Sequence, residues 1–437
     1  MTPLAPTPAP PAIGRPRRAL LAGAAGNFVE WYEFGVYGCF ATVIADHFFT
    51  PPPTGDGAAA GGAGPLIATY ASFAVAFFFR PAGALLFGRL GDRLGRRTGL
   101  VLVIGLMTLA TTLIGLLPTR AAAGAAAPVL LTLLRALQGL SAGGEFGGAV
   151  ALMTEHAPPG RRGRYGAWQS LTVALGLLAG AATAALLATV LPPAALHAWG
   201  WRIPFLLALP LGLTVLWLRT TLPHDPAPPP RPPRPYGPAR GATVRAVVLG
   251  VGRIMGWSAA GYTFLVVLPS YLQQTLGASF REALIATALA NLGFAASILP
   301  AGMLSDRIGR RPVMLAGALT VALLALPLLH LIQDPAAPAP AKAAAVLGAG
   351  AVVGLLAGPG PAMLAEMFPA RVRCTGLSLA YALANAVFSG CAGLVVTALI
   401  AATGNTDVPA LYAAGACAVS ALALASLRGD DHRRPLR

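Results

Sequence analysis

Charged residues are scarce in this chain of 437 residues, where Asp, Glu, Lys and Arg together make up only 11%. A soluble domain carries about 25%, so the composition excludes a water-soluble globular protein. Of the 31 basic residues only one is a lysine, Lys342. The four cysteines, Cys39, Cys374, Cys391 and Cys417, all lie in apolar stretches. Their spacing is not that of a disulfide framework or a metal site.

Apolar residues make up 56% of the chain, and the mean hydropathy is +0.68. A helix that crosses a bilayer needs about 20 residues, so twelve would use roughly 240, a little over half of the chain. We therefore predict an all-α membrane protein with 12 transmembrane helices. The expected spans are 19–46, 65–88, 98–117, 127–153, 165–190, 200–221, 245–268, 282–303, 312–332, 343–366, 374–402 and 408–427.

A Pro-rich polar stretch, TLPHDPAPPPRPPRPYGPARGA at 222–243, separates the sixth expected span from the seventh. Such a composition is typical of an extended linker. The expected parts are a cytoplasmic tail (1–17), an N-terminal six-helix half (18–221), the linker (222–243), a C-terminal six-helix half (244–427) and a second tail (428–437).

Basic residues predict the orientation of these spans. The tails and alternate loops that share one side hold 24 of them, the loops of the other side hold four, and three lie within spans. Because loops rich in Lys and Arg stay in the cytoplasm, we expect both termini there.

An internal repeat supports the division into halves. GRLGDRLGRR at 88–97 and GMLSDRIGRR at 302–311 share the pattern G-x-L-x-D-R-x-G-R-R and are 214 residues apart. Each follows the second expected span of its half. Two six-helix halves repeated in parallel are typical of one large class of transporters.

Both decapeptides match the loop signature of the major facilitator superfamily, which this chain resembles. Within it, the chain resembles the metabolite:proton symporter family, whose members carry α-ketoglutarate, citrate, shikimate, proline or glycine betaine. The matching segments are 26–38, 80–97, 135–149, 199–212 and 365–390. The resemblance implies proton-coupled import of a small polar metabolite across a bacterial inner membrane, with the proton gradient as energy source and no cofactor. One departure is Glu33, where the family usually has Asp.

Five ionisable residues fall near mid-membrane depth: Glu30, Glu33, Arg80, Arg135 and Arg253. A charge there costs at least about 2.5–3.5 kcal/mol, so these side chains should face a cavity or a partner. We expect one of the two glutamates to carry the proton and the three arginines to bind substrate. The alternative is a static ion pair that only holds spans together.

Other polar side chains in the spans could also bind substrate through hydrogen bonds. These candidates are Tyr37, Trp257, Tyr262, Asn291, Tyr381 and Asn385. The alternative for each is a role in helix packing.

The repeated decapeptides are expected to form a cytoplasmic gate. A short acidic residue among arginines at helix ends can pair with them in one alternating-access state and release them in the other. The expected gate residues are Gly88, Asp92, Arg93, Arg96, Arg97, Glu145, Asp306, Arg307, Arg310 and Arg311, with Glu155 nearby. The alternative is that the arginines only fix the topology.

Several activities find no support in the sequence. There is no G-x-x-x-x-G-K-[ST] phosphate loop, so ATP is not expected to drive transport. No nucleophile or metal-ligand constellation indicates an enzyme or a metal site, and no nucleic-acid partner is expected. The partners we expect are a small metabolite, protons and the lipid bilayer. A non-transporting sensor on the same fold stays an alternative, although the predicted tails are short for a signalling domain.

The expected substrate is a di- or tricarboxylate or a keto acid. Three arginines against two glutamates leave a positive cavity, and a guanidinium binds a carboxylate in bidentate fashion. The alternative is an osmolyte such as proline or glycine betaine, whose cation would need aromatic faces like Trp31 and Tyr262. The family's osmolyte sensors carry a long C-terminal extension, whereas this chain ends about ten residues after its last expected span, which favours the carboxylate.

Overall fold

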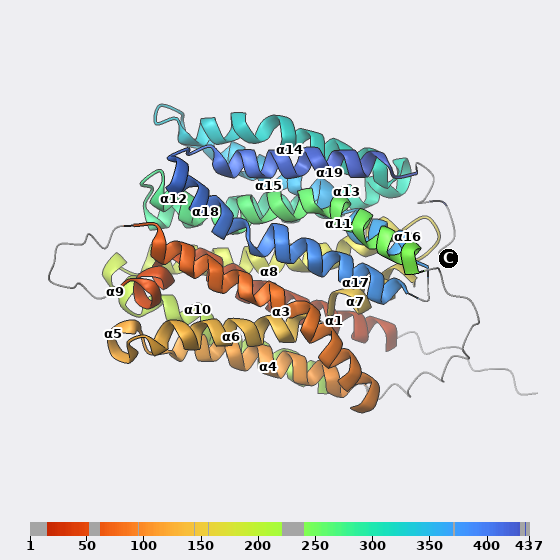
Figure 1. The fold of residues 1–437 in the computed structure, drawn as a ribbon, viewed down its shortest axis with the longest axis horizontal. Coiled ribbons are helices and arrows are strands. Elements are labelled where there is room, and N and C mark those ends of the chain that lie inside the picture. Colours follow the sequence, from red (N-terminus) through yellow and green to blue (C-terminus); the bar gives the residue numbers. More distant parts are fainter. Residues whose placement is uncertain are drawn as a thin grey trace, which may run out of the picture.

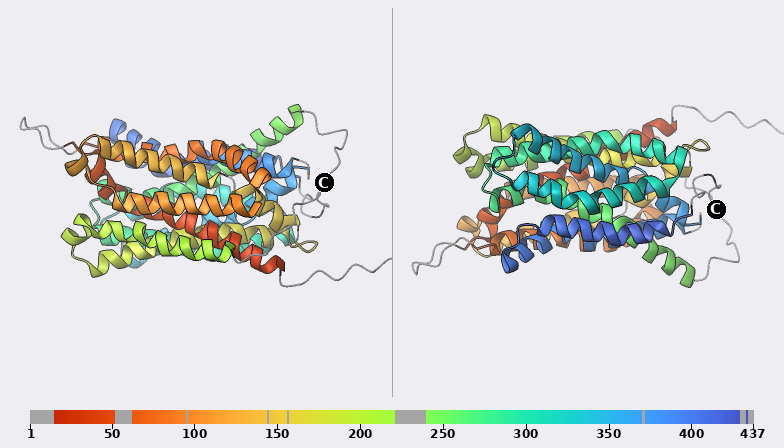
Figure 2. Two further views of the ribbon diagram at one scale, coloured as in Figure 1. Left: turned by 90° about the horizontal axis from the view of Figure 1, so that it is seen from below. Right: turned by 90° about the horizontal axis from the view of Figure 1, so that it is seen from above.

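The computed structural model describes residues 15–51, 62–94, 96–143, 145–155, 157–220, 240–369, 372–428 and 433. These residues form helices and the turns between them, with no strand. The helices lie side by side in one bundle (Figures 1 and 2). Helix α1 (Arg15–Cys39) begins and α19 (Val408–Ala425) ends at the same end of this bundle. We call this end the terminal end and the opposite one the far end.

The other helical elements follow the chain back and forth between these two ends, and some passes consist of two or three consecutive elements. Those of the first half are α2 (Ala41–Ile44), η1 (Ala45–Phe49), α3 (Gly64–Leu94), α4 (Arg96–Leu116), α5 (Arg120–Ala123), α6 (Ala126–Ala142), α7 (Glu145–Glu155), α8 (Arg162–Val190), α9 (Pro193–Ala198), η2 (Gly200–Arg202) and α10 (Ile203–Thr220). Those of the second half are α11 (Arg240–Tyr262), η3 (Thr263–Val267), α12 (Leu268–Gln274), α13 (Phe280–Ile308), α14 (Arg310–Gln333), α15 (Ala339–Ala357), α16 (Gly360–Met367), α17 (Arg373–Ala384), η4 (Asn385–Gly390) and α18 (Ala392–Thr403).

Ten helical segments of the described residues are long and apolar enough to cross a membrane, and α4 adds the shorter apolar stretch Val101–Leu116. Helix α1, which carries two glutamates, is not among the ten. The all-helical membrane fold is confirmed, whereas the count of twelve spans and the side on which the termini lie stay predictions. Most of the expected linker lies outside the described residues, and α11 begins four residues before its expected boundary.

Helices α3 and α6 cross at backbone contact because glycines line the crossing. A Cβ atom at Gly139 would overlap the Ala76 carbonyl, and one at Gly143 would overlap that of Arg80. A side chain at Gly83 would likewise overlap Leu140. Two of these glycines, Gly139 and Gly143, belong to the expected fourth span. The close crossing fixes α3, which carries Arg80, against α6, which carries Arg135.

Two helices of the second half are interrupted at mid-length by π-helical turns, η3 and η4. A π turn inserts a residue and frees backbone groups from the regular ladder. In η3 the Leu265 carbonyl accepts a hydrogen bond of 3.3 Å from the Asn291 amide of α13. Element η4 packs on α3 of the first half. Irregular turns therefore lie where the two halves meet.

The halves touch at both ends of the bundle. Helix α8 packs along α13, and α3 packs against η4 and α18. At the far end the Tyr70 and Ser270 hydroxyls lie 2.7 Å apart, and the Thr42 hydroxyl donates to the Gln273 side chain at 3.0 Å. Both contacts join first-half helices to α12.

Candidate functional site

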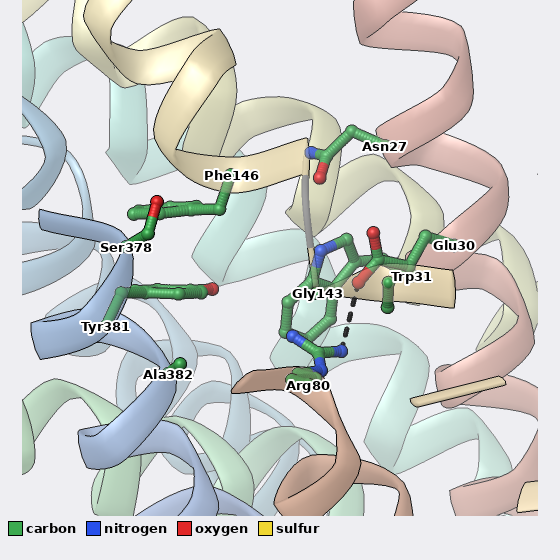
Figure 3. Close-up of a pocket in the computed structure, with 10 residues that line it drawn as sticks. Asn27, Glu30, Trp31, Arg80, Gly143, Phe146, Ser378, Tyr381 and Ala382 are labelled. Atoms are coloured by element: carbon green, nitrogen blue, oxygen red, sulfur yellow. Dashed lines mark ion pairs between the residues drawn. The ribbon is translucent and has the colours of Figure 1, made fainter. Parts of the chain in front are cut away.

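A small cavity lies between the halves, where α1, α3, α6 and α7 face α17 (Figure 3). Arg80, which borders it, comes 16 residues after the start of α3 and 14 before its end, so the cavity lies near mid-bundle. Its lining residues are Asn27, Glu30, Trp31, Arg80, Ala142, Gly143, Phe146, Ser378, Tyr381 and Ala382. Its volume is about 20 Å³, enough for one water molecule. Ligand pockets are usually about 300 Å³ or larger, so a metabolite enters only after the helices part.

Arg80 and Glu30 form an ion pair on the wall of this cavity, with Nη2 and Oε1 3.0 Å apart (Figure 3). Arg80 is only 4% exposed, and its guanidinium carbon lies 4.5–5.5 Å from the ring centres of Phe77, Phe34 and Trp31. Its Nε and Nη2 atoms make no hydrogen bond within the described residues, because the contact with Glu30 is close but not aligned as one. Arg80 is thus held by aromatic faces and by the Glu30 charge, while its Nε and Nη2 donors make no aligned hydrogen bond within the described residues.

The second buried arginine belongs to a chain of hydrogen bonds inside the first half. Arg135 Nη1 donates to Gln138 Oε1 at 2.7 Å, and Gln138 Nε2 donates to the Thr111 hydroxyl at 2.6 Å. That hydroxyl also contacts Oε2 of Glu33. Glu33 is 1% exposed, and its Oε1 has no hydrogen-bond partner among the described residues. Neither Glu33 nor Arg135 lines the cavity, and the chain joins them without direct contact.

Aromatic residues from both halves surround these charges. The Phe146 and Tyr381 rings stack across the halves with centres 3.4 Å apart, and Trp257 lies 5.9 Å from Tyr381. Tyr262 packs against Trp31 and Phe77, and its buried hydroxyl has no hydrogen-bond partner in the part of the chain that the structure describes.

Tyr37, another predicted substrate residue, does not line the cavity. It lies under the Arg135 guanidinium at 4.3 Å and binds Ser72 through its hydroxyl at 2.6 Å.

Three more predicted substrate residues lie elsewhere. Arg253 donates to the Ala423 carbonyl and, at 2.9 Å, to the Ser426 hydroxyl, so it ties α11 to the end of α19. Asn291 supports the η3 turn. Asn385 donates back to the Tyr381 carbonyl one turn earlier, at 2.9 Å. The two asparagines stabilise interrupted helices, and none of the three lines the cavity.

The second copy of the decapeptide makes a cross-half contact at the terminal end. The Asp306 carboxylate accepts hydrogen bonds from the Gly163 and Arg164 backbone N–H groups, at 2.7 and 2.8 Å. It therefore caps α8, a helix of the other half. Arg310 binds Asp306 at 2.7 Å. Arg307 and Arg311 are exposed.

Glu366 and Arg373, which the sequence did not single out, extend this contact. Arg310 donates two hydrogen bonds to Glu366, and Arg373 donates one of 2.6 Å to Glu155 of α7. Both residues fall within segment 365–390, but their partners are distant in sequence. The side chains of six predicted gate residues lie outside the described residues: Gly88, Asp92, Arg93, Arg96, Arg97 and Glu145.

Within the described residues no group of three or more His, Cys, Asp or Glu side chains is placed to hold a metal ion. What the arrangement offers instead is two buried carboxyl groups, two buried guanidinium groups and aromatic walls. Together these groups can bind an anion and hold a proton.

Comparison with known proteins finds transporters along both halves of the chain. Residues 19–227 match the family model described as sugar (and other) transporter, and residues 253–437 match that of the major facilitator superfamily. The chain is 33% identical to the ectoine/proline transporter ProP of Corynebacterium glutamicum, over 96% of this chain and 85% of that protein. It is 35% identical to the α-ketoglutarate permease of Escherichia coli (87% of each chain) and to the citrate-proton symporter of Klebsiella pneumoniae (90% and 88%).

Solved structures show the same fold. A D-xylose-proton symporter superposes with a TM-score of 0.71 at 20% identity, covering 93% of this chain and 97% of that one. The inward open conformation of the xylose transporter XylE from E. coli gives a TM-score of 0.72 at 18% identity, covering 93% and 95%.

Proposed function

Because the chain belongs to the major facilitator superfamily and, within it, to the metabolite:proton symporter family, we propose that it imports a small polar metabolite together with a proton. The relatives are transporters and not enzymes. Twelve spans, cytoplasmic termini and a place in a bacterial inner membrane are part of the proposal. The proton gradient supplies the energy, and no cofactor is needed.

The substrate site is proposed from one edge of the Arg80 guanidinium, whose Nε and Nη2 donors make no hydrogen bond within the described residues. Nε and Nη2 lie on one edge of a guanidinium and point in parallel, which matches the two oxygens of a carboxylate. In Arg310 this same edge is filled by Glu366, at 3.3 and 3.0 Å. In Arg80 the edge is buried and makes no hydrogen bond within the described residues, and only its Nη2 atom has a charged neighbour, Glu30 at 3.0 Å. A substrate carboxylate bound there would replace Glu30 at Nη2 and would give Nε an acceptor.

Glu33 is our proposed proton carrier. An ionised carboxylate with an unpartnered oxygen, 1% exposed, is expensive to keep in a bilayer, and a bound proton removes that cost. Glu30, by contrast, has the Arg80 cation at 3.0 Å. We therefore assign the proton to Glu33 and assign Glu30 to the control of Arg80.

Alternating access would use the contacts at the two ends. Opening the terminal end breaks the Asp306 cap on α8 and the Arg373–Glu155 pair. Opening the far end breaks the Tyr70–Ser270 and Thr42–Gln273 contacts. The small volume of the cavity suits a state between these two.

The leading candidate substrate is a carboxylic acid, such as a keto acid or a di- or tricarboxylate. Only Arg80 and Glu30 bring charge to the lining, because Arg135 and Arg253 lie elsewhere. The substrate carboxylate would take the place of Glu30 beside Arg80, the cation of this lining.

The second candidate is a zwitterionic osmolyte. With Glu30 ionised the lining is neutral, and Trp31 and Tyr381 offer faces for a cationic nitrogen. Relatives of both substrate types match the chain at similar identity.

Uptake into proteoliposomes tests the function and separates the candidates. An inward proton gradient should drive accumulation of labelled α-ketoglutarate or citrate, and excess unlabelled acid should block it. Block by proline or glycine betaine alone would move the assignment to the osmolyte. Absence of both accumulation and counterflow for every one of these compounds would indicate a non-transporting sensor.

A further inference from the structure

Thr111 links Glu33, the proposed proton carrier, to Arg135 through the Gln138 side chain. Its hydroxyl contacts Oε2 of Glu33, receives the Gln138 amide at 2.6 Å, and lies 3.0 Å from the Met107 carbonyl of its own helix. It is 1% exposed. Glu33, Gln138 and Met107 thus share one buried hydroxyl group as hydrogen-bond partner.

The chemistry of the chain fixes which way its hydrogen bonds run. Arginine only donates, so the Gln138 side chain must present its oxygen to Arg135 and its NH₂ group to Thr111. Thr111 therefore accepts from Gln138, and its single proton is left for either Glu33 or Met107. All donors upstream of Thr111 point from the cation toward the carboxyl group.

The position of the Thr111 hydroxyl proton distinguishes two hydrogen-bond arrangements, one for protonated and one for ionised Glu33. When Glu33 is protonated, its OH donates to Thr111, and Thr111 donates to the Met107 carbonyl. When Glu33 has lost its proton to water in an open state, Thr111 turns its hydroxyl to the carboxylate. Every upstream bond is the same in both. Aligned hydrogen bonds polarise one another. The positive charge of Arg135 therefore polarises Gln138 and Thr111, and this strengthens the hydrogen bond from Thr111 to the Glu33 carboxylate.

We propose that Thr111 is a positioning residue that switches its hydroxyl proton with the charge of Glu33, and that Gln138 holds it in place. The inference rests on the proposed function, since it takes Glu33 as the proton carrier. It adds how an arginine that does not touch Glu33 sets the pH at which the proton leaves. The other charged groups that act on Glu33 are Glu30, on the same helix, and Arg135 itself.

The test is a pH titration of the purified full-length chain by infrared spectroscopy, which needs no substrate. The C=O stretch of a protonated buried carboxyl group is assigned to Glu33 by its loss in Glu33→Gln. A hydrogen bond to a charged group is worth about 1.5–3 kcal/mol, so Thr111→Val should move the midpoint of this band upward by roughly one to two pH units.

Matched variants control for structural damage. Thr112→Val removes a neighbouring buried hydroxyl that also bonds back to its own helix, at 2.8 Å, and should leave the midpoint unchanged. Thr111→Ser keeps the hydroxyl and should restore the wild-type value. Gln138→Leu should shift the midpoint in the same direction as Thr111→Val.

The possible outcomes are distinct. If the band is present but Thr111→Val and Gln138→Leu titrate like wild type, the relay is refuted while the proton assignment stands. If no band is lost in Glu33→Gln, the proposed proton carrier itself is wrong. Should Thr111→Val fail to fold, Gln138→Leu compared with Thr111→Ser decides by the same criterion.

Discussion

The guanidinium carbons of Arg80 and Arg135 both lie 4.8 Å from the centre of the Phe34 ring. One ring therefore touches the arginine proposed to bind substrate and the one linked to the proposed proton carrier. Phe34 is also the residue directly after Glu33 in α1. A movement of Arg80 toward a substrate would change its contact with this ring, which Arg135 also touches.

This contact predicts that Phe34 couples the two sites. Phe34→Leu keeps an apolar side chain but removes the π face, at a cost of about 0.5–2 kcal/mol per cation–π contact. We expect counterflow within about threefold of wild type and proton-driven accumulation reduced about tenfold. Phe40→Leu, which alters an aromatic pair outside the site, is the control. Equal losses of counterflow and accumulation would argue against coupling through the ring.

Removing the charge of the Asp306 cap should affect gating. Asp306→Asn weakens the attraction between its carboxylate and the α8 N-terminus. We expect transport to slow roughly tenfold while equilibrium binding changes less than twofold, measured by uptake and by calorimetry on the same preparation. Asp334→Asn is a matched control. The Asp334 carboxylate, in a far-end loop, also accepts a hydrogen bond of 2.8 Å from a backbone N–H group. A variant that lost binding but kept its turnover would overturn the gate.

Steric contact at the α3–α6 crossing makes a prediction about stability. A methyl group at Gly139 would overlap the Ala76 backbone, so Gly139→Ala should destabilise the protein by about 1–3 kcal/mol, as overpacking does. Gly105→Ala in α4 meets no atom within 4 Å and should be nearly neutral. Thermal unfolding of the two variants in detergent compares them directly, and equal midpoints would contradict the described crossing.

At the far end His330 lies 3.2 Å from Asp407, just before α19. The hydrogen bond from His330, helped by Gln333, holds the pKa of Asp407 below its ordinary value of 3.8. Because the pKa is lowered in the folded state, the stabilisation is complete above that value and is lost as the pH falls through the lowered one. The thermal midpoint of wild type should therefore drop more steeply between about pH 5 and 3 than that of Asp407→Asn. Parallel curves would show that the pair contributes nothing.

The sequence predicted depth along the helices better than it predicted partners. Glu30 and Arg80 were expected near mid-membrane, and they meet in the cavity. Arg253 has a similar expected depth, yet it faces α19, because depth does not fix the direction in which a helix turns its side chains. Glu366 and Arg373 were missed for a related reason. Their partners lie 56 and 218 residues away, and only the packing of the helices brings them together.

Substrate recognition by the Arg80 donor edge is the central claim, and Arg80→Lys tests it most directly. Lysine keeps the positive charge but lacks the parallel pair of N–H groups. We predict that proton-driven uptake of the substrate identified in proteoliposomes falls at least tenfold in Arg80→Lys. We also predict that the methyl ester of its carboxylate fails to compete in wild type. Wild-type uptake by Arg80→Lys, or full competition by the ester, would contradict the account.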